Sequence, residues 1–121
     1  MFKWLKKKSN STSENEKGAD FSQINSNDKA IQLFKKGELT EIHLMPLEFG
    51  GQDLPMNILY APKFAKAAKH EFDKMIEKFL IDGKKLSYSA EPEYKGKSFI
   101  PSKLHISVTG DLEFSETINI W

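Results

Sequence analysis

Apolar and polar residues alternate with a period of two in the C-terminal third of the chain. The alternation runs through residues 86–90, 104–108 and 112–120. It is typical of strands that bury one face and expose the other. Gly110-Asp111 separates the last two segments and predicts a tight hairpin turn. This part of the chain therefore predicts an antiparallel sheet with one face packed against a helix.

Between residues 62 and 82 the apolar period becomes helical. Pro62 suits the first turn of a helix, where its missing N–H costs nothing, and Gly83 can end the helix. The apolar residues of this segment form one stripe: Phe64, Ala68, Phe72, Met75, Ile76 and Phe79. A shorter helix is expected after Asn27, and strands over residues 39–47 and 57–61. The predicted class is α+β, with a single antiparallel or mixed sheet of about five strands on one long helix, in the order α-β-β-α-β-β-β.

The N-terminal residues differ from the rest in composition. Residues 9–18 contain no apolar side chain to bury, so we expect residues 1–27 to form a disordered tail and residues 28–121 to form one domain. The segment Met1–Lys8 combines Phe2, Trp4 and Leu5 with four lysines. It can make a weak contact with an anionic membrane surface, or it is a solvated basic leader.

Composition narrows the possible functions. The net charge of +1 gives no whole-chain reason to expect nucleic acid. Cysteine is absent, which excludes disulfides and cysteine zinc sites and fits a reducing cytosol, so a cytoplasmic location is expected. No apolar run reaches the roughly 20 residues of a membrane span. The three histidines could form a metal site with Glu41, Glu48 or Asp53 if the strands of His43 and His105 are neighbours. A lone strand histidine is far more often a half-exposed polar residue than a ligand, so neither a metal site nor a cofactor is expected.

The segment from His43 to Asn57 is the most informative. It contains His43, then Pro46 three residues later, the Gly50-Gly51 pair and Asn57 before a second apolar run. These positions, with the helix that follows, resemble the ββα unit of HNH nucleases. The resemblance covers residues 43–82 and implies a metal-dependent nuclease with His43 as the general base. However, Ile42 stands where that family has a metal ligand, and residues 63–67 supply none.

A second polar loop precedes the 104–108 strand and interleaves aromatic residues with lysines. Such a surface suits stacked bases and phosphates, or an acidic protein, or it is simply an anchored hairpin connection. As a whole, the chain is similar to small bacterial domains that begin with a basic-aromatic leader, a resemblance that implies no activity.

We expect the protein to act by binding, with another protein as its partner, for example as an immunity-type inhibitor. The alternative is an HNH-like nuclease, degenerate or active. The candidate binding residues come from the two loops: Glu48, Phe49, Gln52, Asp53, Tyr94, Lys95, Lys97, Phe99 and Lys103.

Overall fold

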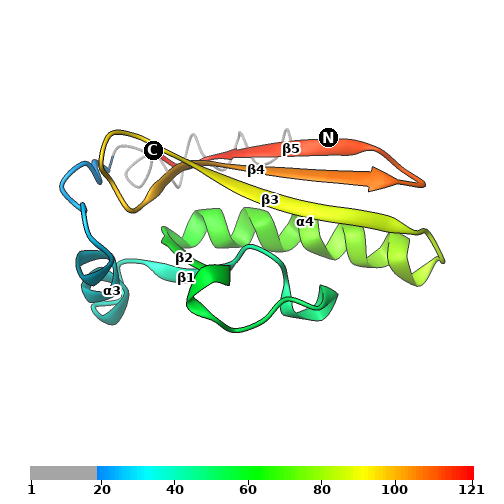
Figure 1. Ribbon diagram of the computed structural model, residues 1–121, viewed down its shortest axis with the longest axis horizontal. Helices are drawn as coiled ribbons and strands as arrows, with labels where there is room; N and C mark the ends of the chain where they lie inside the picture. Colours follow the sequence, from blue (N-terminus) through cyan, green and yellow to red (C-terminus); the bar gives the residue numbers. More distant parts are fainter. Residues whose placement is uncertain (1–18) are drawn as a thin grey trace.

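The computed structural model describes residues 19–121, which fold into two layers (Figure 1). Short 3-10 turns, η1 (Leu47–Phe49) and η2 (Pro55–Asn57), lie between the first two strands. The predicted α+β class and element order are confirmed. The helices and strands are α3 (Asn27–Lys35), β1 (Thr40–His43), β2 (Ile58–Ala61), α4 (Lys63–Ile81), β3 (Leu86–Tyr94), β4 (Pro101–Gly110) and β5 (Phe114–Asn119).

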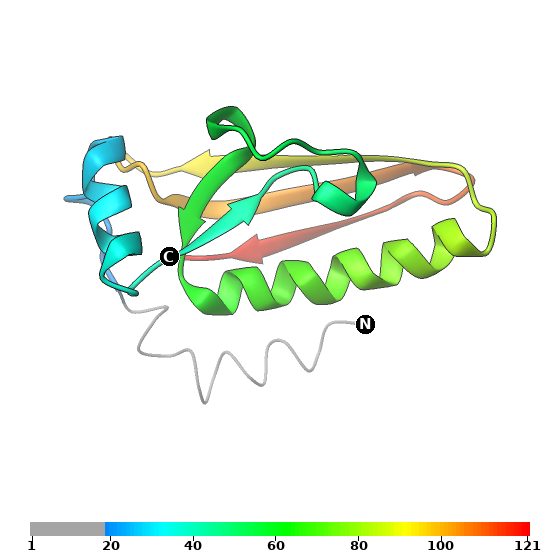
Figure 2. The same ribbon diagram turned by 90° about the horizontal axis from the view of Figure 1, so that it is seen from below.

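The prediction of a single sheet is wrong, because the strands form two separate antiparallel sheets. β1 pairs with β2, and β3, β4 and β5 form the other sheet, with β4 in the centre. The β1–β2 hairpin lies beside α4, and together they cover one face of the three-stranded sheet (Figure 2). Ile42 and Leu59 of the hairpin are buried in the same core as Leu104 of β4. Packing between layers, rather than flanking strands, therefore covers the apolar side chains of the hairpin.

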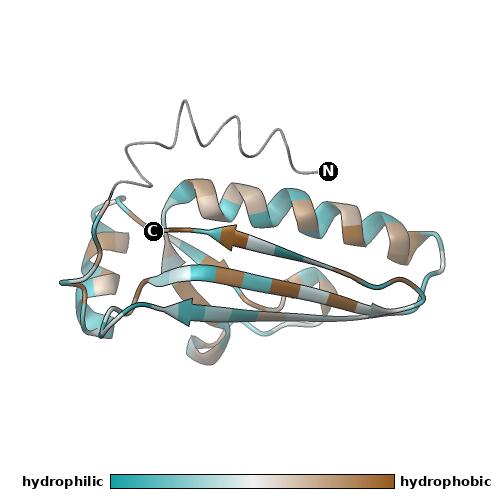
Figure 3. Ribbon diagram, turned by 90° about the horizontal axis from the view of Figure 1, so that it is seen from above, coloured by the Kyte–Doolittle hydropathy of each residue, from teal (hydrophilic) through white to brown (hydrophobic). Residues whose placement is uncertain are grey.

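The main core lies between the two layers. Along β4, buried apolar residues alternate with polar ones, as the sequence predicted (Figure 3). From α4, Phe72 packs its ring 5.7 Å from that of Phe114 on β5. Ile76 lies one turn further along the same buried side of the helix. These contacts fix α4 along the sheet and so determine which of its other side chains face the hairpin.

A second, smaller core closes one end of the molecule around Ala30, Leu39 and Ile100. Phe21 and Ile24, which the sequence analysis placed in the tail, pack against this core. The packed part of the chain therefore begins before Asn27, and hydrogen bonds from Ser98 and Phe99 to the carbonyls of Phe21 and Ile24 also hold this segment. The rest of the tail prediction, including the membrane contact of Met1–Lys8, lies outside the described residues. Within residues 19–121 no helix is long and apolar enough to cross a membrane.

Candidate functional site

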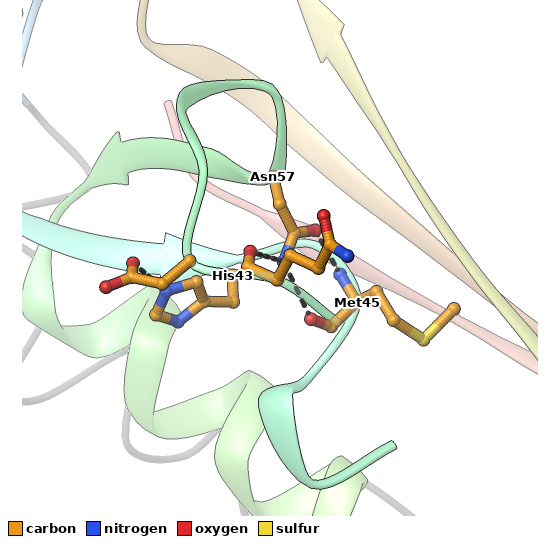
Figure 4. Close-up of polar contacts among 5 residues, drawn as sticks. His43, Met45 and Asn57 are labelled. Carbon is orange, nitrogen blue, oxygen red and sulfur yellow. Dashed lines mark hydrogen bonds and ion pairs between the residues drawn. The ribbon is translucent and has the colours of Figure 1, made fainter. Parts of the chain in front are cut away.

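The β1–β2 hairpin and α4 form a ββα unit whose strands are joined by a long connection, residues 44–57. Asn57 holds this connection closed (Figure 4). Its side-chain Nδ2 donates to the carbonyls of Met45 (3.0 Å) and Gln52 (2.8 Å), and its Oδ1 accepts from the Met45 N–H (2.8 Å). Its main-chain carbonyl accepts from the N–H of Leu44 at 2.9 Å. One side chain thus satisfies three main-chain groups of an irregular segment.

Gly51 allows the connection to pass close to its own beginning. A Cβ atom at this position would lie 2.0 Å from the carbonyl oxygen of Met45, so no other residue fits without a shift of the backbone. Gly50 has a φ of 100°, a left-handed backbone conformation that glycine adopts without the steric cost that a side chain would add. The glycine pair and Asn57 therefore act together to hold the connection in a compact conformation.

His43 ends β1 and pairs with Asp53 from the connection. Its Nε2 donates to Oδ1 of Asp53 at 3.0 Å. Since a carboxylate only accepts, Nε2 carries the proton, and Nδ1 is the atom that can act as a base. The Asp53 side chain is 71% exposed, so this pair lies at the surface. The arrangement orients the imidazole ring of His43.

A pocket of about 170 Å³ lies between the hairpin, η1 and α4. Within residues 19–121, no three His, Cys, Asp or Glu side chains are grouped as a metal site requires. Ile42, at the position of the expected ligand, is 2% exposed and belongs to the core. The polar side chains that line the pocket come from both sides: His43, Glu48, Lys66, Lys69, His70 and Asp73.

A buried polar network forms one wall of this pocket. Lys69 is 3% exposed and donates from Nζ to Oδ2 of Asp73 at 2.8 Å. Tyr88 of β3 donates its hydroxyl to the other carboxylate oxygen at 2.5 Å. Burial lowers the pKa of Lys69, and Asp73 offsets part of that shift. Burial and then the Asp73 carboxylate raise the pKa of Tyr88 well above its usual value. An ammonium group held here repels a metal cation from the pocket.

This network was not predicted from the sequence, although the sequence contains a signal for it. Lys69 lies at helical spacing from the buried residues of α4, four residues after Ala65 and three before Phe72. It therefore belongs to the buried stripe of this helix, which continues to Ile76. Asp73 lies four residues after Lys69, the spacing of a helical ion pair. A lysine on an apolar stripe with an acid one turn later is therefore the pattern that predicts such a pair.

The two predicted loops lie apart in the molecule, with residues 95–100 beside α3 and residues 44–57 alongside the hairpin (Figures 1 and 2). In the first loop, Phe49 packs its ring 5.5 Å from that of Tyr88, and Gln52 and Asp53 make the contacts described above. Glu48 is exposed beside the pocket.

The second loop makes two internal contacts and leaves most of its nominated side chains exposed. Lys95 places Nζ 4.7 Å from the centre of the Trp121 ring. Phe99 donates its N–H to the carbonyl of Ile24 at 2.7 Å, although its side chain is 48% exposed. Tyr94 and Lys97 are exposed, and Lys103 lies on the outer face of β4. The first loop also exposes three apolar side chains that are not among the predicted binding residues: Leu47, Leu54 and Met56.

No protein-family model matches this chain, and a search of curated proteins also finds no match.

Proposed function

We propose that this protein acts by binding another protein, and that the connection 44–57 is its binding surface. The observation that carries the proposal is the exposure of Leu47, Leu54 and Met56, at 45%, 45% and 84%, on a connection that Asn57 holds in one conformation. Exposed apolar groups gain free energy when a partner covers them. A preorganised loop loses little conformational entropy on binding.

Residue chemistry favours binding over hydrolysis. A metal-dependent nuclease needs a cation beside the phosphate, and here the pocket that His43 lines also holds the core residue Ile42 and the Lys69 ammonium group. The chain keeps the features that shape the ββα unit, namely Gly51 and Asn57. An immunity-type inhibitor that caps a toxin in the cytoplasm is one specific form of this proposal.

The binding proposal is tested with two matched double variants. Leu54→Gln with Met56→Gln removes apolar groups from the connection, whereas Leu80→Gln with Ile81→Gln removes groups of comparable exposure from the end of α4. Each variant, immobilised, is used to capture partners from native cells, and stoichiometric partners are quantified by mass spectrometry. The loop variant should lose about tenfold or more of the bound partner, since each buried side chain contributes about 1.5–3 kcal/mol. Equal capture by both variants would contradict the proposal.

A second candidate function is an HNH-like nuclease, which the His43–Asp53 pair at the pocket favours. In that case Mg²⁺ or Zn²⁺ would support cleavage of DNA or RNA, and His43→Ala would abolish it. Cleavage that survives in His43→Ala would come from another site or a contaminant. We expect neither the wild type nor His43→Ala to cleave, because no cluster of side chains among residues 19–121 could hold a metal ion.

A further inference from the structure

The free edge of β3 has a backbone pattern that can be worked out from its pairing with β4. The N–H of Asp111 donates to the carbonyl of Lys85 at 3.0 Å, just before the paired residues Leu86 and Gly110. In an antiparallel pair, alternate residues bond to the neighbouring strand. The odd-numbered residues of β3 therefore bond to β4. Leu86, Tyr88 and Ala90 turn their N–H and C=O groups to the open side.

Pro92 is the next residue of β3 whose main-chain groups face the open side, and proline has no N–H to donate there. Proline at such a position is typical of an edge strand. Within residues 19–121, β3 pairs only with β4, so residues 86–90 present an open template for another strand. α4 runs along the β5 side of the molecule, away from this edge (Figure 2).

The charges that flank this template are arranged symmetrically. Lys85 lies three residues before Tyr88, and Glu91 lies three residues after it. Both side chains are exposed. Side chains alternate between the two faces along a strand, so the odd-numbered Lys85 and Glu91 lie on the outer face of the sheet with Ser87 and Ser89. If two β3 strands pair antiparallel about Tyr88, Lys85 of each lies directly opposite Glu91 of the other. These are the close, non-hydrogen-bonded pairs in which opposite charges are favourable.

From this self-complementary pattern we propose that a second copy of this chain pairs with the β3 edge, antiparallel and centred on Tyr88, to form one continuous six-stranded sheet. The pairing makes about six backbone hydrogen bonds, between the two Tyr88 residues and between Leu86 and Ala90 at each end. It buries much less than the roughly 1,600 Å² of a standard interface, so the dimer is weak and depends on concentration.

Sedimentation equilibrium at protein concentrations from about 10 µM to 1 mM tests the proposal. The wild type should dimerise, and Lys85→Glu and Glu91→Lys should each weaken dimerisation by about tenfold or more, since both cross-strand pairs become repulsive. A mixture of the two variants should form a heterodimer of wild-type affinity, because each Glu then faces a Lys. Lys97→Glu, with the same charge change on the β3–β4 connection, should leave dimerisation unchanged.

A second measurement does not depend on charge. Ala90→Pro removes an outward N–H that β4 does not use, so it should abolish dimerisation without loss of the monomer fold, checked by circular dichroism. In the wild type, amide hydrogen exchange at Tyr88 and Ala90 should slow as concentration rises. A wild type that stays monomeric at 1 mM, or a dimer that Lys85→Glu and Ala90→Pro leave intact, would overturn the proposal.

Discussion

The connections 44–57 and 95–100 both join antiparallel strands, but different parts of the chain hold them in place. The first is held by its own residues, through the hydrogen bonds of Asn57 and the close passage at Gly51. The second is held from outside. The hydroxyl of Ser98 donates to the carbonyl of Phe21 at 2.7 Å, and Lys95 lies over the ring of Trp121.

This difference supports the proposal that the 44–57 connection is the binding surface. In the 95–100 connection, Lys95 lies over the Trp121 ring and the main chain of Phe99 bonds to Ile24, although the side chains of Tyr94 and Phe99 stay exposed. In the 44–57 connection, polar groups hold the backbone and leave Leu54 and Met56 exposed. A loop that is stabilised by its own main-chain contacts can present apolar side chains to a partner without losing its shape.

The largest loss of stability should follow a substitution in the buried network that forms one wall of the pocket. Asp73→Ala leaves the buried Lys69 ammonium group and the Tyr88 hydroxyl without their shared acceptor. We expect a loss of about 3–5 kcal/mol in the free energy of unfolding, measured by urea denaturation. Asp53→Ala removes an exposed partner of His43 and should cost about 1 kcal/mol or less. Equal effects would show that Lys69 is not buried as described.

Asn57→Ala should have the next largest effect. It removes the side chain that bonds Met45 and Gln52, so we expect a loss of about 2–4 kcal/mol, since partly buried main-chain groups lose their partners. Amide exchange at the Met45 N–H should accelerate. Unchanged exchange there would contradict the assignment of Asn57 as the residue that closes the connection.

Ser98→Ala tests the second connection in the same way. Its hydroxyl donates to Phe21 and accepts from the N–H of Ile100 at 3.0 Å, so its loss should cost about 1–2 kcal/mol. Amide exchange should accelerate around residues 21–24 and stay unchanged in residues 44–57. Faster exchange in both segments would mean that the two connections are coupled.

The smallest effect should follow Lys95→Met. An exposed cation–π contact with Trp121 contributes about 0.5–1 kcal/mol, so thermal stability should fall only slightly. Partner capture should remain at the wild-type level, because the account assigns Lys95 to an internal contact. A loss of capture would contradict this assignment and indicate that the 95–100 connection contacts the partner.

Much of the fold could be predicted from the sequence because its signals are local. The period-two alternation in 104–108 and the stripe of α4 are each set by the side chains of one segment. The split into two sheets could not be predicted. Ile42 and Leu59 would be apolar and buried both in a central strand of one sheet and in a separate hairpin that packs against another layer, so the sequence pattern does not distinguish the two arrangements. The role of Lys95 also depended on Trp121, which lies far away in the sequence.

At the candidate site, the sequence identified His43, Asn57 and the glycine pair, but not what they do together. Turn chemistry at Gly51 and Asn57 is visible in the sequence, whereas the pairing of His43 with Asp53 depends on the path of the connection. The exposure of apolar residues such as Met56 could not be predicted, because a hydrophobic pattern assigns apolar residues to the core.

The most direct test of the account is amide hydrogen exchange of the protein alone and in complex with its captured partner. If the connection 44–57 is the binding surface, exchange in residues 47–56 should slow in the complex, and exchange in residues 94–103 should stay the same. Protection confined to residues 94–103 would contradict the account and assign binding to the other connection.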